Sequence, residues 1–157
     1  MFEEATATVF QETFNLEGTN LLGQGASGIV ADGEVQQGEK WLLWDNKRRT
    51  GNFKLGSDPQ SKIINYIEQK RQQHQVEWFL IIAPSFASSA GENAVTIEKR
   101  LGIDIRLITA GDFKALAETW RERFAAENRE LPLSIFYGSE EFNLEASTGA
   151  LVLIRSD

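Results

Sequence analysis

The chain has no cysteine and a single histidine among its 157 residues. The lack of cysteine excludes disulfides and thiolate zinc sites, and one histidine excludes metal motifs that need two. No apolar run approaches the roughly 18 residues that span a bilayer, and acids stand at the N-terminus where a secretory signal would carry lysine or arginine. We therefore expect a cytoplasmic protein with no membrane partner.

Positive charge is also scarce. Lys and Arg number 16 against 23 Asp and Glu, so the net charge is −7. Proteins that bind nucleic acid unaided neutralise phosphates with cationic side chains, so a role on nucleic acid would need a local basic patch or a separate binding module. Basic residues do gather at Lys47, Arg48, Arg49 and Lys54. Taken alone, a solvated surface is the simpler interpretation of that cluster.

What the chain does contain is an alternation of strand and helix patterns, in a length that suits one domain over residues 1–157. Helices are predicted over residues 2–14, from an Asp58 N-cap to about 74, over 90–101 with Gly102 as C-cap, and over 110–127. Strands are predicted at 29–34 and 40–47, joined by a turn at 36–39, and at 76–84 and 103–109. This order predicts an α/β sheet with helices on both faces.

Three segments carry less information. Residues 16–28 are predicted to be a loop; the stretch "GQGASG" at 23–28 matches a dinucleotide fingerprint in letters, but it follows a helix and enters a strand, so we interpret its glycines as turn residues. His74 lies among glutamines and charges at a predicted helix end, where a solvated histidine is the expected state. Residues 130–157 are assigned only as a docked tail or extra strands, at 131–138 and 149–157.

The predicted hairpin places three chemically useful side chains together. If its strands pair in antiparallel fashion, Asp32 lies close to Asp45 and Lys47. Residues two apart on a strand face the same side, so Asp45 and Lys47 project together while Asn46 points away.

Two carboxylates and a backbone carbonyl are hard oxygen ligands suited to Mg²⁺. A lysine beside them could lower the pKa of an attacking water or neutralise charge that develops on a phosphate. The alternative interpretation is a strand-end acid with a surface ion-pair partner, worth under about 1 kcal/mol. The spacing alone does not separate the two, because D-x-K is a common tripeptide.

The surrounding sequence resembles a known nuclease motif. "ADGEV", followed by an apolar strand ending in "WDNK", is similar to the PD-(D/E)xK motif, with Ala31 in place of the usual proline and Asn46 at the middle position. "FEEATATVFQETFNLEGTNLLG" resembles the opening helix and loop of FokI-type cleavage domains of type IIS restriction endonucleases. "RRTGNFKL", "NYIEQK" and "WFLIIAPSF" resemble later stretches of that family. The resemblance extends over residues 2–86 closely and over 103–124 loosely.

The resemblance implies a restriction-endonuclease-like fold, a central mixed sheet flanked by helices, and an endonuclease acting on double-stranded DNA. It implies Asp32, Asp45 and Lys47 as catalytic residues, supported by Glu4 at the place of the family's helix glutamate. The implied cofactor is Mg²⁺, with Mn²⁺ as an alternative, bound by Asp32, Asp45 and the backbone carbonyl of Asn46.

The resemblance also bears on partners. FokI-type cleavage domains are attached to a DNA-recognition domain, and nothing in this chain resembles one, so we expect an excised domain or a small cleavage subunit that works with a larger one. Ser61 and Asn65 stand where the family has an Asp and an Arg that help it dimerise, which favours a transient heterodimer over self-association. Arg48, Arg49 and Lys54 are expected to contact the DNA backbone.

Two alternatives to a restriction nuclease stay open. One is a nuclease of the same superfamily in DNA repair or phage defence, acting on branched DNA or on RNA. The other is an inactive interaction module with the same fold, against which the intact Asp32, Asp45 and Lys47 argue.

Overall fold

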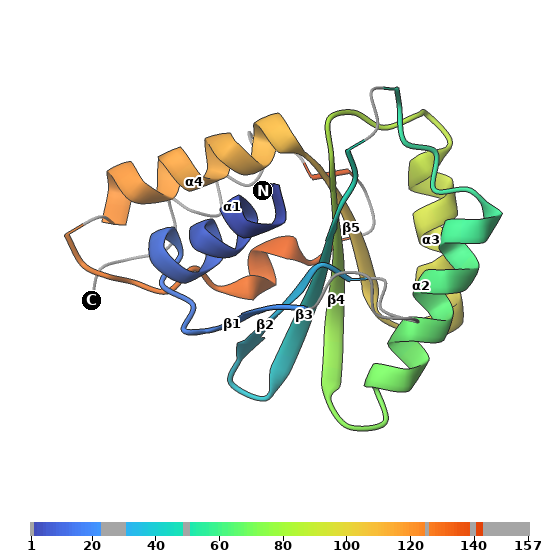
Figure 1. Ribbon diagram of the computed structural model, residues 1–157, viewed down its shortest axis with the longest axis horizontal. Helices are drawn as coiled ribbons and strands as arrows, with labels where there is room; N and C mark the ends of the chain where they lie inside the picture. The colour runs from blue at the N-terminus through green and yellow to red at the C-terminus, as the bar shows by residue number, and fades with distance from the viewer. Residues whose placement is uncertain (1, 23–30, 49–50, 125, 139–140, 143–157) are drawn as a thin grey trace.

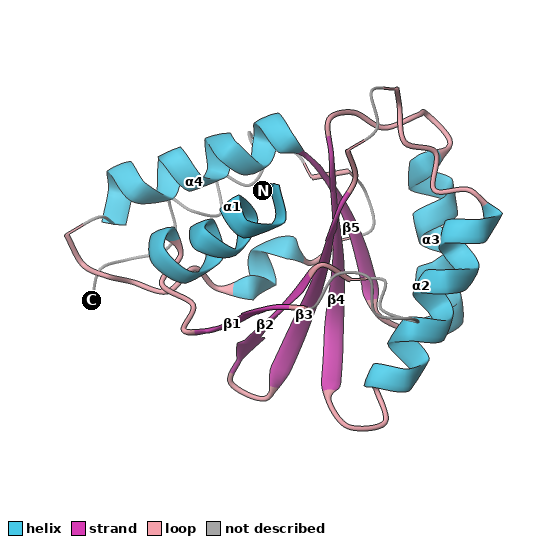
Figure 2. Cartoon of the chain, in the orientation of Figure 1, coloured by secondary structure: helices cyan, strands magenta, loops and turns pink. Residues whose placement is uncertain are grey.

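The computed structural model describes residues 2–22, 31–48, 51–124, 126–138 and 141–142, which form one five-stranded sheet with helices on both faces (Figures 1 and 2). The strands lie side by side in chain order: β1 (Gly18–Leu21), β2 (Gly33–Gln37), β3 (Lys40–Asn46), β4 (Gln75–Ala83) and β5 (Asp104–Thr109). The pairs β1–β2 and β2–β3 are antiparallel, whereas β3–β4 and β4–β5 are parallel. The predicted α/β fold with a mixed sheet is therefore confirmed.

The helices form two layers (Figure 1). One face of the sheet is covered by α1 (Phe2–Thr8), which continues into a π-helical turn, η1 (Val9–Thr13), and by α4 (Ala110–Phe124). The other face is covered by α2 (Ser57–Lys70) and α3 (Ala90–Leu101). Among the described helices, none combines the length and hydropathy that a bilayer crossing requires.

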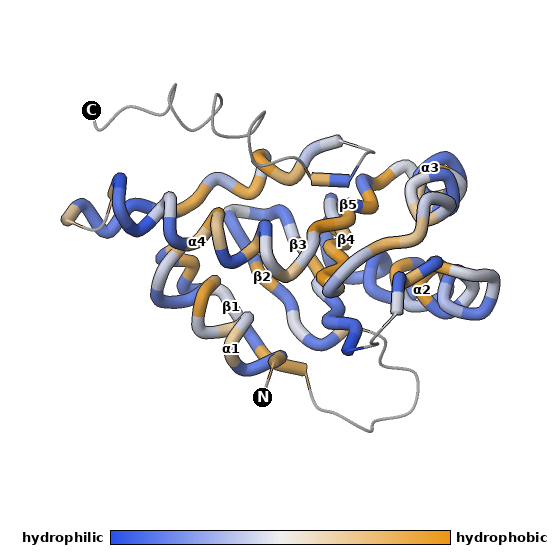
Figure 3. Tube along the Cα trace, turned by 90° about the horizontal axis from the view of Figure 1, so that it is seen from above, coloured by the Kyte–Doolittle hydropathy of each residue, from blue (hydrophilic) through white to orange (hydrophobic). Residues whose placement is uncertain are grey.

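Strand β4 is buried on both faces, as predicted from its continuous apolar run, whose hydrophobic residues are coloured orange in Figure 3. Leu80 and Ile82 pack against the α1/α4 layer, while Phe79 and Ile81 pack against the α2/α3 layer. Each such side chain contributes about 1.5–3 kcal/mol by leaving water. Because β3 pairs with β4, the carboxyl end of β3 also lies between the α1/α4 layer and the α2/α3 layer.

The hairpin differs from its prediction in position. Its first strand begins at Gly33 and its turn is the pair Gly38–Glu39, where Gly38 adopts φ +63°. A strand of four residues, β1, occupies part of the segment predicted as loop. It pairs with β2 despite its polar, glycine-containing sequence, so the backbone ladder rather than side-chain propensity defines it.

Helix α3 and its C-cap agree with the prediction, and Gly102 has the expected left-handed φ of +71°. Helix α2 begins at Ser57, after an extended Gly56, so the predicted Asp58 N-cap is wrong by two positions; residues beyond Lys70 form turns.

The strand predicted at 131–138 is also wrong. Its centre is a 3₁₀ helix, η2 (Leu133–Phe136), whose apolar side chains dock into the α1/α4 core and so satisfy burial without sheet pairing. The glycines at 23–28, the hairpin residues 29–30 and the strand predicted at 149–157 lie outside the described residues.

Candidate active site

The site is built at the carboxyl end of β3. The apolar stretch Leu42–Trp44 is buried and is followed by Asp45 and Asn46, which are only 4% and 7% exposed. Trp44 packs into the α1/α4 core and Leu43 into the α2/α3 core. Because side chains alternate along a strand, Asp45 shares the α2/α3 face with Leu43.

Lys47 is held beside Asp45. The Lys47 backbone N–H donates to the carbonyl of Ile82 (2.8 Å), which extends the β3–β4 ladder by one residue. The Lys47 ammonium lies 2.8 Å from Oδ2 of Asp45. The prediction that these two side chains project together is confirmed.

Asp32 precedes β2 and is fixed to the same strand end. Its backbone N–H donates to the carbonyl of Trp44 (2.8 Å), and its Oδ2 accepts from the backbone N–H of Asn46 (2.7 Å). A Cβ on Gly33 would lie 2.0 Å from the Trp44 ring. Only glycine can therefore follow Asp32 without displacing the tryptophan that anchors the end of β3.

Burial dominates the electrostatics of Asp45. It raises the pKa of Asp45 from 3.8 to about 7, although the charge of the nearby Lys47 ammonium lowers the pKa. The charge and hydrogen bonding of the Asp32 carboxylate raise it further. Asp45 is thus a carboxyl that is costly to ionise until additional positive charge arrives.

Asn46 points to the opposite face, as predicted, and its side chain ties β3 to the first helix. Its Oδ1 accepts from Nε1 of Trp44 (3.1 Å), and its Nδ2 donates to the hydroxyl of Thr6 (3.1 Å). The Thr6 hydroxyl in turn donates to the carbonyl of Phe2 (3.0 Å). These contacts hold the end of β3 on the α1/α4 face of the sheet, and they were not predicted from the sequence.

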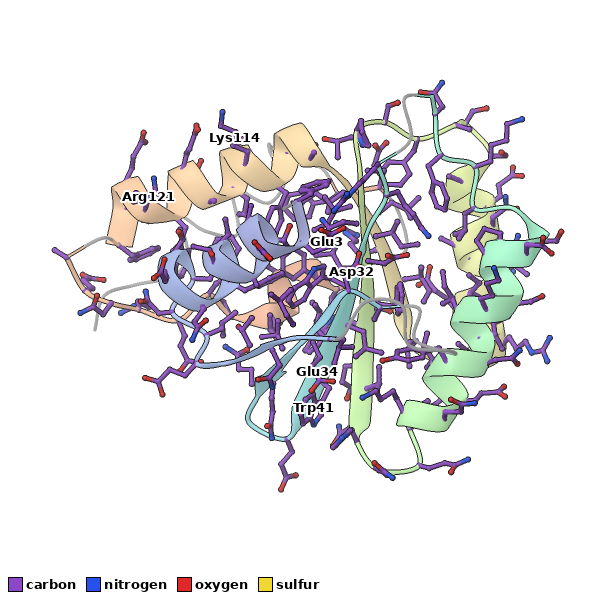
Figure 4. All side chains as sticks on the ribbon, viewed as in Figure 1. Glu3, Asp32, Glu34, Trp41, Lys114 and Arg121 are labelled. Carbon is purple, nitrogen blue, oxygen red and sulfur yellow. The ribbon has the colours of Figure 1, made fainter. Side chains whose placement is uncertain are left out.

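Of the two glutamates in the first turn of α1, Glu3 is the buried one (Figure 4). Glu4, predicted to support the site, is exposed, whereas Glu3 is 6% exposed and forms an ion pair with Arg48. Burial raises the pKa of Glu3, but hydrogen bonds from its own backbone N–H and from Arg48 outweigh it, so the pKa is lowered overall. The i, i+3, i+7 spacing of Glu3, Thr6 and Phe10 could have placed Glu3 on the inner face.

The donor set fits a divalent cation that keeps several of its waters. Among the described residues, no group of three or more His, Cys, Asp or Glu is arranged to hold a metal. However, two carboxylates converge here, and the buried Oδ2 of Asp45 has Lys47 as an ion-pair partner but no hydrogen bond of good geometry among those residues. Mg²⁺ sites commonly use one or two protein carboxylates, together with waters and substrate phosphates.

The sequence model of the FokI cleavage domain matches residues 1–136. The chain belongs to the FokI cleavage-domain family. No curated protein matches the chain.

Solved structures of FokI-type enzymes share the fold. The chain is similar to the restriction endonuclease FokI, with 14% identity, a TM-score of 0.64 and coverage of 83% of this chain and 28% of that one. FokI bound to DNA gives 14% identity, a TM-score of 0.63 and coverage of 84% and 28%. The chain thus spans less than a third of the FokI chain.

A shorter relative is covered more completely. The small subunit R.BspD6I2 of the heterodimeric restriction endonuclease R.BspD6I is 14% identical, with a TM-score of 0.64 and coverage of 96% of this chain and 86% of that one. At this identity the likeness concerns the fold.

Of the three residues predicted to contact the DNA backbone, the two that the structure describes lie at the surface. The Arg48 side chain is 59% exposed, and Lys54 is exposed, while Arg49 lies outside the described residues. Ser61 and Asn65 are both exposed on α2. Arg48 and Lys54 are thus accessible from solvent, and the exposed α2 positions 61 and 65 carry uncharged side chains.

Proposed function

We propose that the chain is a Mg²⁺-dependent DNA endonuclease, acting as the catalytic domain or small cleavage subunit of a type IIS-like restriction enzyme. The observation that carries this proposal is the convergence of Asp32, Asp45 and Lys47 at one strand end in a member of the FokI cleavage-domain family. The residue types match what phosphodiester hydrolysis requires: oxygen ligands for a cation and a positive charge near the reacting phosphate.

Asp32, Asp45 and the backbone carbonyl of Asn46 would hold Mg²⁺, or Mn²⁺ in its place. When bound, the cation supplies Lewis-acid polarisation of a phosphate oxygen and of a water. The anchoring of Asp32 by the N–H of Asn46 keeps the two carboxylates in register for this task. Because burial raises the pKa of Asp45, its carboxylate form is disfavoured in the metal-free site. A bound cation would stabilise that ionised form.

Lys47 acts at the solvent side of the carboxylates. Its side chain is 26% exposed, so the ammonium can contact both Asp45 and a water or phosphate oxygen arriving from outside. In that position it donates a hydrogen bond that orients the attacking water and offsets the negative charge that develops on the phosphate.

Recognition comes from another domain or a larger subunit. The net charge of −7 limits unaided binding to DNA, and Arg48, Arg49 and Lys54 supply only local phosphate contacts. Attachment to a recognition element would raise the effective concentration of the site at its target. The coverage of the R.BspD6I2 small subunit supports a cleavage subunit of this kind, paired with a larger partner in a heterodimer.

The test is cleavage of supercoiled plasmid by the chain fused to an unrelated DNA-binding domain, with Mg²⁺ present or chelated. The variants are Asp45→Asn and, as a matched control, Glu34→Gln, which alters another buried acid that is paired with a lysine, Lys70. We expect Mg²⁺-dependent nicking or linearisation by wild type and Glu34→Gln, and none by Asp45→Asn. Inert wild type, or equal cleavage by Asp45→Asn, would contradict the proposal.

A further inference from the structure

An aromatic ring faces the lysine of the candidate site. The Lys47 ammonium lies 5.3 Å from the centroid of the Phe53 ring, within the range of a cation–π contact. Phe53 is 3% exposed, and it packs in the α2/α3 core with Leu43 and Leu55. The ammonium therefore lies between a carboxylate at 2.8 Å and the face of a buried ring.

The ring is held in place by two loops. Phe53 lies in the loop after β3 and pairs with the loop after β4: its N–H donates to the carbonyl of Ser85 (3.0 Å), and its carbonyl accepts from the N–H of Ala87 (2.9 Å). The ring also contacts Phe86 edge-on, with the centroids 6.4 Å apart. The position of the ring is thus fixed independently of Lys47.

We propose that Phe53 is a positioning residue that holds the Lys47 ammonium over Asp45. The inference rests on the proposed function. A lysine side chain has four rotatable bonds and a strongly hydrated head, so it occupies one position only when its surroundings restrict it. Asp45 restricts the ammonium from one side, and the negative face of the Phe53 ring restricts it from the other.

A purely structural role for Phe53 makes a different prediction from a cation–π role. If the ring only fills the core, its volume matters and its electron distribution does not. If it positions the ammonium, withdrawing electrons from the ring face weakens the contact while the shape is nearly kept. Fluorinated phenylalanines separate the two cases, since successive fluorines reduce the negative face of the ring.

The experiment incorporates mono-, di- and trifluorophenylalanine at position 53 in the plasmid-cleaving fusion, and measures the single-turnover cleavage rate with Mg²⁺. We expect the rate to fall stepwise with each fluorine, by about threefold to thirtyfold in total. The matched control is the same series at Phe79, which is buried in the α2/α3 core and has no cation over its ring among the described residues. Fluorination at Phe79 is expected to leave the rate unchanged.

A second readout does not depend on activity. Protons on the ε-carbon of Lys47 above the ring face should show an upfield ring-current shift by NMR, which Phe53→Leu removes. A wild-type fusion that cleaves while its rate is indifferent to fluorination at Phe53, or a Lys47 resonance at its ordinary position, would overturn the inference alone. A wild type that cleaves no DNA overturns the proposed function, and the positioning role with it.

Discussion

Two lysine–carboxylate pairs lie on the same face of the sheet, and only one of them belongs to the candidate site. Lys47 and Asp45 are 2.8 Å apart with side chains 26% and 6% exposed, while Lys70 and Glu34 are 3.2 Å apart with side chains 27% and 12% exposed. Glu34 pairs across the strands with Leu43, so it points toward α2 as Asp45 does. Each lysine also lies over an aromatic ring.

The difference between the pairs is a second carboxylate. Asp32 is anchored to the backbone beside Asp45 and helps to raise its pKa, whereas the lysine of the other pair joins α2 to β2. Figure 4 shows Asp32 at the beginning of β2 and Glu34 farther along the strand. A buried ion pair is therefore a weak indication of function by itself, and two converging acids with a lysine are a stronger one.

The largest expected effect separates the two lysines. Lys47→Met should reduce plasmid cleavage by the fusion about 10²- to 10⁴-fold, because the charge nearest the reacting phosphate is lost. Lys70→Met should leave cleavage unchanged and lower the melting temperature, since it leaves Glu34 buried without its ion-pair partner. Equal rates in the two variants would remove the distinction between the pairs.

Asp45 and Glu34 should differ in how they affect the pH dependence of the free energy of unfolding. The folded-state pKa of Asp45 is raised from 3.8 to about 7, so the folded chain binds more protons than the unfolded chain in that window, and metal-free stability falls as pH rises through it. Asp45→Asn should therefore be more stable than wild type at pH 8, by at most about 4 kcal/mol, and should lose this advantage near pH 4.

Urea unfolding at both pH values measures this effect. Glu34→Gln should instead be less stable than wild type at pH 8, because it weakens the ion pair with Lys70. Added Mg²⁺ should stabilise wild type and not Asp45→Asn. An Asp45→Asn variant that is less stable at pH 8 would show that burial of this carboxyl is not costly.

Gly33 is the first residue of β2 and lies between Asp32 and Glu34, so its substitution tests the backbone that supports both acids. Gly33→Ala should lower the free energy of unfolding by about 1–3 kcal/mol, because its Cβ would lie 2.0 Å from the Trp44 ring and force a backbone shift. Gly91→Ala is the control, since a Cβ there meets nothing within 4 Å and alanine favours the α3 helix. Comparable stability of the two variants would mean that Trp44 moves aside easily.

The smallest expected effect concerns the outer ion pair. Arg48→Met removes a partner of the buried Glu3, but the arginine side chain is 59% exposed, so the loss of stability should be about 1 kcal/mol and should shrink in high salt. Thermal unfolding at two salt concentrations measures it. A loss as large as that of Gly33→Ala would place Glu3 among the main supports of the site.

Much of this arrangement could be predicted from sequence because it follows from local periodicity. The apolar runs predict β4, α3 and α4, and strand alternation puts Asp45 and Lys47 on one face. The short polar strand β1 could not be predicted, since its partner supplies its pairing. Likewise the burial of Glu3 and the exposure of Glu4 depend on how α1 packs against the sheet, which is a tertiary property.

The most direct measurement is a Mn²⁺ titration followed by electron paramagnetic resonance on wild type, Asp45→Asn and Glu34→Gln. If Asp32 and Asp45 form a cation site, wild type and Glu34→Gln will bind Mn²⁺ with similar affinity, Mg²⁺ will displace it, and Asp45→Asn will bind at least about tenfold more weakly, a difference of about 1.4 kcal/mol. If wild type binds no Mn²⁺ at millimolar concentration, or if Asp45→Asn binds as tightly as Glu34→Gln, the second carboxylate does not make a metal site.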